Sequence, residues 1–289
     1  MNGGILVKKN TSILIVLVLL MTSTITYGTI AEKLTNHWAD SVINRSFVAY
    51  YFPYLAKENF SKFDPNAFIS EEDFTLSIAS LFKDYNYDVS GSGASGNLSR
   101  KDMISNLGSK LVEIGLKIDN DNNIPFKDTN TMSSDSIELL RLLNNHGIIL
   151  GDPDLSFNPD RNLSQVEAII ILQRSKEVLE EMNTVAFKTL GIVQSFNSQE
   201  EIIIKEESNK VLVTITKQFP TPGYSMSINR IRKDKDGYRV YFNITPPKED
   251  SIQIQVITYK TLTMEIDKNL LNGQPYNFIL DGYNAIANS

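Results

Sequence analysis

Arg100 has a residue type and a position that suit the binding of a negatively charged group. It follows Ser99, which has the type and placement of a helix N-cap, so Arg100 is expected in the first turn of a helix. There the planar guanidinium can hold a carboxylate through two parallel hydrogen bonds, and the positive end of the helix dipole attracts the same charge. The chemistry predicted at this position is anion binding.

Residues for covalent or metal chemistry are scarce. The chain has no cysteine and only two histidines, His37 and His146. Thiol catalysis, disulfides and cysteine-based zinc sites are therefore excluded, and neither a Ser-His-Asp triad nor a multi-histidine metal site is expected. A polysaccharide hydrolase needs two carboxylates placed across a cleft, and no acidic residues form a recognisable pair of this kind. We expect a protein that is not an enzyme and that uses no cofactor and no metal.

The helix start at Ser99 belongs to a segment that occurs three times in the sequence. In each copy a serine is preceded by an apolar residue and followed, three and four positions later, by an acidic and an apolar residue: Ile69-Ser70 with Asp73-Phe74, Leu98-Ser99 with Asp102-Met103, and Leu163-Ser164 with Glu167-Ala168. The serine and the acid fit an N-cap and its N3 position, and the apolar pair fits a hydrophobic staple. F-x-P precedes the first and third copies, at residues 63–65 and 157–159. Such fixed repetition predicts a repeat architecture.

Three further short motifs accompany the copies: His37-Trp38-Ala39, Phe126-Lys127-Asp128, and the turn at residues 145–159 with Gly147, Gly151 and Asp154. Together with F-x-P and the helix starts, they resemble the S-layer homology (SLH) repeat, with its H-W-A, F-x-D and I-T-R-A-E-like signatures, over about residues 34–180. This resemblance implies helical repeats packed as a pseudo-threefold prism. It also implies an exported protein held on the cell wall of a Gram-positive-type bacterium, or in its S-layer, by secondary cell-wall polysaccharide.

The same resemblance assigns polysaccharide binding to Trp38, Arg100 and Asp128. Trp38 would offer an apolar face to a sugar ring and Arg100 would bind an acidic group, in a groove between repeats. A second interpretation of Trp38, packing between repeats as part of the core, remains open. The family's arginine is missing in two copies, which carry Glu71 and Gln165, and Lys33 stands near the place of the first F-x-D acid. We therefore expect at most one groove to retain the arginine.

From about residue 185 the apolar residues alternate with polar ones, which is typical of strands. The alternating sets are Val211, Val213 and Ile215; Tyr238, Val240, Phe242 and Ile244; and Ile252, Ile254 and Val256. Asp236-Gly237 predicts a hairpin turn between two of these strands. The sequence therefore predicts a small antiparallel all-β domain over residues 185–287.

The segment Phe219-Pro-Thr-Pro-Gly-Tyr-Ser225 resembles the P-T-G-G-Y-S core of the C-terminal domain of PrcB-type protease-complex proteins, with Pro222 in place of a glycine. The similarity covers about residues 211–267 and implies a role in assembling an extracellular protease complex. Pro220, Gly223 and Tyr224 are then candidates for contact with a protein partner. The alternative is that these residues simply form a turn between two strands.

The first 28 residues have the layout of a secretory signal peptide, in which Lys8 and Lys9 precede the apolar run Ile13–Met21. This run is shorter than a membrane span needs, so an uncleaved anchor is the less favoured alternative and no membrane contact is expected after cleavage. The formal net charge is −6, which disfavours nucleic acid as a partner because phosphate binding requires clustered Lys and Arg.

Three parts are thus expected: a signal peptide at 1–28, degenerate helical repeats at 32–182 and the β domain at 185–287. The leading functional hypothesis is a secreted, non-catalytic protein that binds wall polysaccharide and displays the β domain for protein interaction. The alternative is an accessory or assembly subunit of an extracellular protease complex in which wall binding is weak or lost. The sequence identifies neither the sugar nor the protein partner.

We expect the signal peptide to be removed after Gly28 or Ala31, where small residues meet the requirement of the signal peptidase. N-terminal sequencing of the native protein should then begin near Thr29 or Glu32. A native chain that still begins at Met1 would contradict this expectation and favour the uncleaved anchor.

Overall fold

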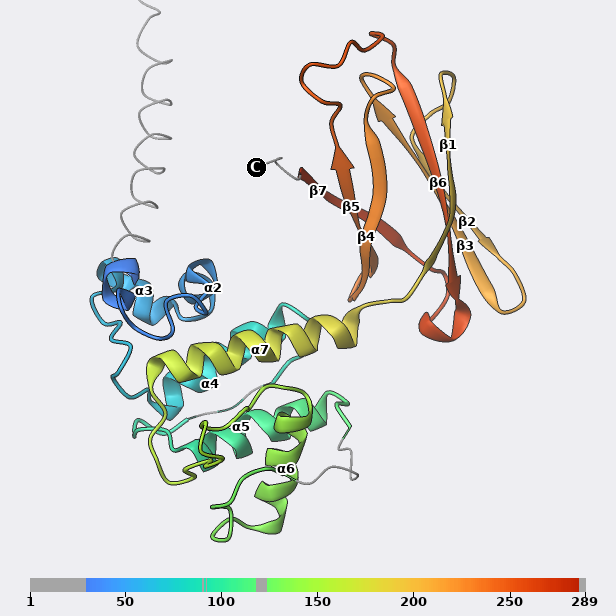
Figure 1. Cartoon of the computed structure of the whole chain (residues 1–289). Helices are drawn as coiled ribbons and strands as arrows, with labels where there is room; N and C mark the ends of the chain where they lie inside the picture. The colour runs from blue at the N-terminus through green and yellow to red at the C-terminus, as the bar shows by residue number, and fades with distance from the viewer. Residues whose placement is uncertain (1–29, 90, 92, 118–123, 286–289) are drawn as a thin grey trace, which may run out of the picture. The chain divides into compact units, whose positions relative to one another are not determined.

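The computed structural model describes residues 30–89, 91, 93–117 and 124–285. The chain divides into two compact units, one ending at Leu179 and the other beginning at Glu180 (Figure 1). The expected signal peptide lies outside the described residues. Among the helices within the described ranges, none combines the length and the apolar character that crossing a membrane requires.

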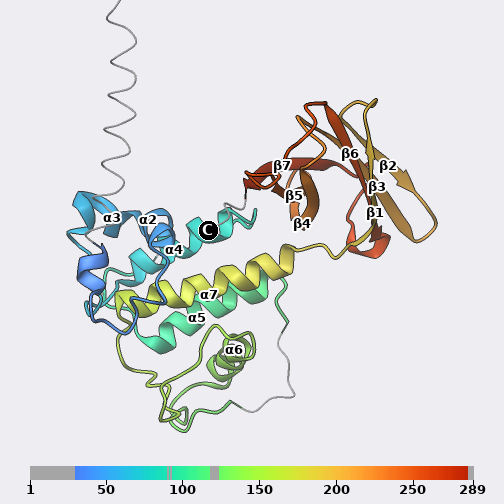
Figure 2. The ribbon, with the colours of Figure 1, turned by 45° about the horizontal axis from the view of Figure 1, so that its top comes forward.

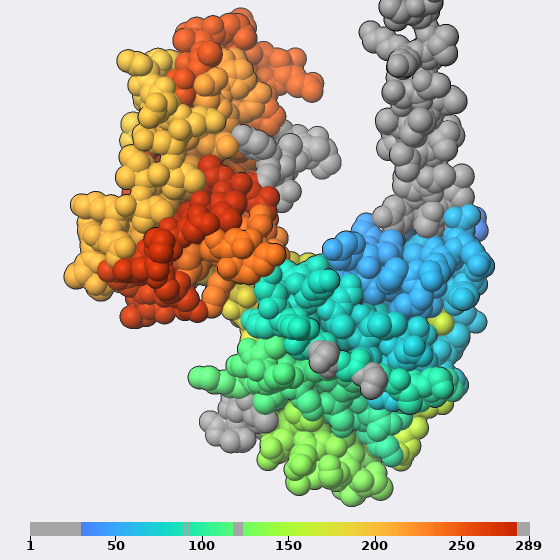
Figure 3. All heavy atoms as spheres, turned by 180° about the vertical axis from the view of Figure 1, so that it is seen from behind, coloured from blue at the N-terminus to red at the C-terminus, as the bar shows by residue number. Residues whose placement is uncertain are grey.

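The first unit is helical. After helical residues 30–34 come α2 (Arg45–Tyr51), α3 (Pro53–Phe60), α4 (Glu71–Lys83), α5 (Arg100–Glu113), α6 (Ser134–Asn145) and α7 (Gln165–Asn183). Figure 2 shows α4, α5 and α7 running close together through this unit, and Figure 3 shows the N-terminal segments, in blue, lying against the blue-green surface that follows them.

The repeated serines cap the helices as the sequence predicts. The hydroxyl oxygens of Ser70 and Ser99 accept hydrogen bonds from the backbone N–H groups three residues later, at the starts of α4 and α5. Ser164 does the same for α7, and its own N–H donates to the Glu167 carboxylate at 3.0 Å, which completes a capping box. These helix starts are confirmed.

The three residues that precede these serines close a ring of backbone hydrogen bonds. The N–H of Ile69 donates to the carbonyl of Leu163 at 3.0 Å, that of Leu98 to Ile69 at 2.9 Å, and that of Leu163 to Leu98 at 2.8 Å. All three side chains are buried. Each copy therefore donates to one of the other copies and accepts from the third, so the three helix starts surround a common centre.

A second set of hydrogen bonds surrounds this ring. The first helical N–H of each copy donates to a backbone carbonyl in the segment that leads into the next copy: Glu71 to Gly96, Arg100 to Arg161, and Gln165 to Ala67. The cyclic order is the same in all three cases. The backbone N–H groups at the helix starts that the serine side chains do not satisfy therefore bond to another repeat.

The second unit contains β1 (Lys188–Ser195), β2 (Glu201–Glu206), β3 (Lys210–Phe219), β4 (Ser225–Asp234), β5 (Gly237–Thr245), β6 (Thr258–Asp267), the short 3-10 helix η1 (Lys268–Leu270) and β7 (Phe278–Ala285). The strands form a four-stranded sheet in the order β1-β6-β3-β2 and a three-stranded sheet in the order β4-β5-β7. Alternate residues of β3 and β6, such as Val213 opposite Met264, are buried in the core of this unit. The predicted hairpin at Asp236-Gly237 is confirmed between β4 and β5.

The expectation of a purely antiparallel domain is wrong, because β7 pairs with β5 in parallel. The strand before β7 is β6, which belongs to the other sheet, and the chain crosses between the sheets after η1 (Figure 1). A crossover connection of this kind allows parallel pairing, whereas a tight hairpin does not.

The strand predicted at Ile252–Val256 is also not formed. The four-stranded sheet begins at Thr258 of β6, which lies opposite Phe219, the last residue of β3. On the other side, β1 ends at Ser195, opposite Tyr259. Residues 252–256 therefore extend past the ends of both neighbouring strands, and their alternation finds no backbone partner.

Replacing each capping serine by alanine should lower the free energy of unfolding of the helical unit by about 1 kcal/mol, because one N–H at the helix start loses its acceptor. Ser70→Ala, Ser99→Ala and Ser164→Ala can be compared in urea titrations followed by helical circular dichroism. The matched control is Ser105→Ala, since Ser105 is an exposed residue within α5. Equal stability of the capping variants and the control would contradict the capping role.

Candidate functional site

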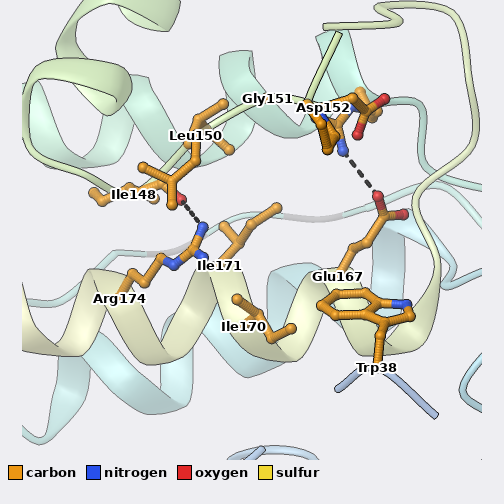
Figure 4. A pocket seen from close by; sticks show the side chains of 12 residues that line it. Trp38, Ile148, Leu150, Gly151, Asp152, Glu167, Ile170, Ile171 and Arg174 are labelled. Atoms are coloured by element: carbon orange, nitrogen blue, oxygen red, sulfur yellow. Dashed lines mark hydrogen bonds and ion pairs between the residues drawn. The ribbon is translucent and has the colours of Figure 1, made fainter. Parts of the chain in front are cut away.

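A pocket of about 400 Å³ opens in the helical unit between α7 and the segment that follows α6. It is lined by Trp38, Arg100, residues 148–153, Glu167, Ile170, Ile171 and Arg174. Figure 4 shows Trp38 near one end of the pocket, beside Glu167, and Arg174 at the other. The isoleucines between them give the pocket a largely apolar wall with charged groups at its ends.

Arg100 lies at the start of α5, as the sequence predicts, but its side chain is only 6% exposed. Its Nε donates to the carbonyl of Phe157 at 2.7 Å, and its Nη1 pairs with Glu167 at 3.0 Å. The guanidinium also lies over the Phe157 ring, 4.9 Å from its centre. Arg100 is therefore already bonded on several sides within the protein.

Glu167 stands between two arginines. Arg161 donates both terminal nitrogens to its carboxylate, at 3.0 and 2.6 Å, in addition to the bond from Arg100. Burial by itself raises the pKa of Glu167, but the hydrogen bonds from Arg161 and the Ser164 amide, with the two arginine charges, outweigh it and leave the pKa below its ordinary value. Glu167 is thus held as an anion that compensates part of the positive charge.

Arg174 is a cation of the pocket that the sequence analysis missed. Its Nη1 donates to the carbonyl of Ile148 at 3.2 Å, and burial lowers its pKa. Within the part of the chain that the structure describes, Arg174 forms no ion pair with a carboxylate. The signal available in the sequence was its spacing, because Glu167, Ile170, Ile171 and Arg174 follow the i, i+3, i+4, i+7 pattern of one helix face.

Trp38 lines the pocket with a side chain that is 64% exposed. The interpretation that it packs in the core between repeats therefore does not describe its position. The neighbouring His37 ring lies 5.5 Å from the Trp38 ring, and His37 Nδ1 accepts the N–H of Ala39 at 3.2 Å. This turn presents the indole to solvent at the mouth of the pocket.

Asp128 is not among the residues that line the pocket. Its two carboxylate oxygens accept the backbone N–H groups of Phe157 and Asn158, both at 2.7 Å. Burial tends to raise the pKa of Asp128, but these backbone hydrogen bonds outweigh it, so the pKa lies below its ordinary value. Asp128 therefore fixes the F-x-P turn whose Phe157 carbonyl in turn bonds Arg100.

Lys33 holds the corresponding turn of the first copy, but it donates to backbone carbonyls, whereas Asp128 accepts from backbone N–H groups. Its ammonium donates to the carbonyls of Phe60 at 2.6 Å and Phe63 at 2.7 Å. The chain there turns through Glu58, Asn59 and Phe60, whose φ angles of 53°, 55° and 59° lie in the left-handed region. The first copy thus has a lysine where the third has Asp128, and its turn presents backbone carbonyls to that side chain where the third presents N–H groups.

The residues at the arginine position in the other two copies also bond to a neighbouring repeat. Gln165 Oε1 accepts the N–H of Asp64 at 3.1 Å, and Glu71 Oε2 accepts the N–H of Ala94 at 3.1 Å. Arg100 makes the equivalent link when its Nε donates to Phe157. All three side chains therefore fasten the start of one helix to the loop that leads into the next copy.

Pro220, Gly223 and Tyr224 form the connection between β3 and β4, which is the alternative that the sequence left open. The Tyr224 ring stacks on Phe219 with centres 5.4 Å apart. A Cβ at Gly223 would collide with the Gln253 side chain and come within 2.8 Å of Pro247, so only glycine fits. The structure brings these three residues together, but in the β unit and not at the pocket.

Comparison with known proteins bears on the β unit. The sequence model of one family, described as PrcB C-terminal, matches residues 210–259, which span β3 to β5 and the start of β6. This confirms the resemblance over that segment, which is a minority of the chain. No family model of SLH repeats matches the chain. A search of curated proteins finds no match.

Asp128→Asn should lower the free energy of unfolding by about 1–2 kcal/mol at neutral pH, because an amide has one acceptor oxygen for two backbone N–H groups. The pKa of Asp128 is lowered in the folded protein, so its contribution is complete well above about pH 4, the ordinary Asp range, and disappears as the pH falls through the native value. The stability difference between wild type and variant should shrink accordingly.

Urea titrations at several pH values measure this difference. Asp88→Asn is the matched control because Asp88 is an exposed aspartate of the same unit. A stability difference for Asp128→Asn that stays constant into acid would rule out the ionised carboxylate as its source.

Proposed function

We propose that this protein is a non-catalytic exported protein whose helical repeats bind an acidic group of secondary cell-wall polysaccharide and whose β unit contacts another protein. The observation that carries the proposal is the pocket that combines exposed Trp38, an apolar wall and Arg174. The ring of three repeats supports it, because the resemblance to SLH repeats implies the same threefold arrangement.

Arg174 is the group that we assign to the acidic sugar. Its guanidinium keeps donors that the single bond to Ile148 does not use, and among the described residues no carboxylate lies within ion-pair distance of it, although the charge of Glu177 acts on it from farther away. Half-buried beside isoleucines, it would gain more from a ligand carboxylate than an exposed arginine would, since water screens the pair less. A sugar ring against Trp38 would cover apolar surface at the other end.

Arg100 has a different role in this proposal from the one that the sequence suggested. Its charge is compensated by Glu167 and the residue is buried, so we assign it to positioning the pocket wall and not to binding the ligand's charge. Arg100→Ala is therefore a poor test of ligand binding. It would leave Glu167 with one arginine and free the Phe157 carbonyl, which alters the fold around the pocket.

A second candidate function is an accessory or assembly subunit of an extracellular protease complex. The match of residues 210–259 to the PrcB C-terminal family favours it. The two functions are compatible in one chain, because the pocket lies in the helical unit and the match in the β unit. Co-purification of a protease with the native protein would support the second candidate.

Arg174→Gln should weaken binding to polysaccharide-bearing wall sacculi by about tenfold to a hundredfold, the usual loss for one charge-assisted hydrogen bond in a partly buried site. Trp38→Ala should weaken it as well, by removing the exposed apolar face. Sedimentation of purified protein with sacculi, before and after chemical removal of the secondary polysaccharide, measures both effects.

The charge-matched control is Lys62→Gln, since Lys62 is exposed and does not line the pocket. Its affinity should equal that of wild type. Equal losses for Arg174→Gln and Lys62→Gln would mean that overall charge, and not the pocket, drives binding. If the wild-type protein fails to bind sacculi, wall attachment is wrong and the second candidate takes its place.

A further inference from the structure

The segment Ser251–Ile257, just before β6, leaves apolar side chains uncovered. Ile252 is 100% exposed and Ile254 74% exposed, and Val256 and Ile257 are exposed as well. Figure 1 draws this part of the chain as a loop beyond the ends of the strands. A neutral, β-prone stretch of this kind, without proline, is a typical place for another strand to pair.

The backbone of this segment is available for such pairing. On one side β6 pairs with β3 from Thr258 onward, and on the other side it pairs with β1 from Tyr259 onward. Before Thr258 the described backbone makes only local hydrogen bonds: the Ser251 N–H donates to Lys248, the Val256 N–H donates to Ile254, and the Thr258 hydroxyl donates to the carbonyl of Val256. A pairing strand would replace the second of these bonds with a ladder.

The side chains of the segment fall into two rows. Ile252, Ile254 and Val256 have the same parity as Leu262 and Met264, which face the core from β6. Gln253 belongs to the other row, and its side chain lies over Gly223 in the connection between β3 and β4. Once the segment is extended in line with β6, this parity places its apolar row on the core-facing side, past the end of the sandwich, where nothing in the described part of the unit covers it.

We propose that Ser251–Ile257 pairs antiparallel with the same segment of a second copy of this chain, with Ile254 on the twofold axis. This register uses the whole unpaired segment. It sets Ile252 opposite Val256 of the other copy, Ile254 opposite its own counterpart, and Gln253 opposite Gln255, so apolar side chains share one face and amides the other.

A second copy is favoured over an unrelated strand by the composition of the segment. It contains no charged residue, so self-pairing brings no like charges together, although Lys248, Glu249 and Asp250 come directly before it. A twofold contact also needs a self-complementary surface, which the alternation centred on Ile254 provides. The contact is short, and two-stranded ribbons are marginal in water, so the dimer should be weak and dependent on concentration.

Cysteine cross-linking tests the register in the whole protein, because the natural chain has no cysteine. In Ile254→Cys the two thiols would meet across the axis, with Cα atoms about 4.5–5.5 Å apart, within the range of a disulfide. Mild oxidation should therefore give a covalent dimer on a non-reducing gel. In the matched control Ile252→Cys the two thiols would be about 13 Å apart, and the dimer band should be absent. Both side chains are exposed, so neither change threatens the fold.

Light scattering across a concentration series tests the dimer itself. Wild type should shift toward twice the monomer mass as the concentration rises, and Ile254→Lys, which sets two like charges opposite each other, should weaken association by about tenfold or more. Cross-linking from both cysteine positions equally, or from neither, would overturn the register. A wild-type protein that stays monomeric throughout the series would overturn the dimer.

Discussion

The helical unit depends on three peptide groups that bond to one another at its centre. Ile69, Leu98 and Leu163 are buried, and a buried N–H or carbonyl without a partner is destabilising by an amount comparable to a lost hydrogen bond. Each of these residues finds its partners only in the other two copies. A single repeat, or a pair, would leave part of the ring unsatisfied. The repeats are therefore obliged to fold together, and the surfaces between them, the pocket included, exist only once the ring is closed.

Local features of this fold could be predicted from the sequence, and contacts between distant segments could not. The serine caps, the capping box at Ser164 and the hairpin at Asp236-Gly237 involve neighbouring residues, whose types determine the geometry. The pairing of Arg100 with Glu167 joins two different copies, and no short window contains both. Arg174 was missed for a related reason. Its helical spacing from Glu167 was visible, but the segment that completes the pocket against it, residues 148–153, follows α6 and is distant in the sequence.

In the β unit, too, the local sequence pattern does not determine which segments pair. Alternation predicts which side chains would share a face if a strand forms, but a strand forms only where a neighbouring backbone accepts its hydrogen bonds. Residues 211–215 and 252–256 alternate equally well, yet only the former lie between two partners, β2 and β6. The parallel placement of β7 likewise depends on where the chain returns after η1, which alternation does not encode.

The residue that follows each capping serine, at the first position of the repeated helix, links one repeat to another. Arginine, glutamine and glutamate there differ in charge and in donor capacity, yet each bonds to backbone in the loop before the next copy. What the position requires is a polar side chain that can reach that loop, and each residue matches the carbonyl or N–H it meets. Glu71 and Gln165 thus have a structural role at this position, whatever their relation to a ligand. Arg100 is engaged in this link and in the pair with Glu167, whereas Arg174, farther along α7, makes no ion pair within the part of the chain that the structure describes; this difference is why our proposal assigns the ligand's acidic group to Arg174.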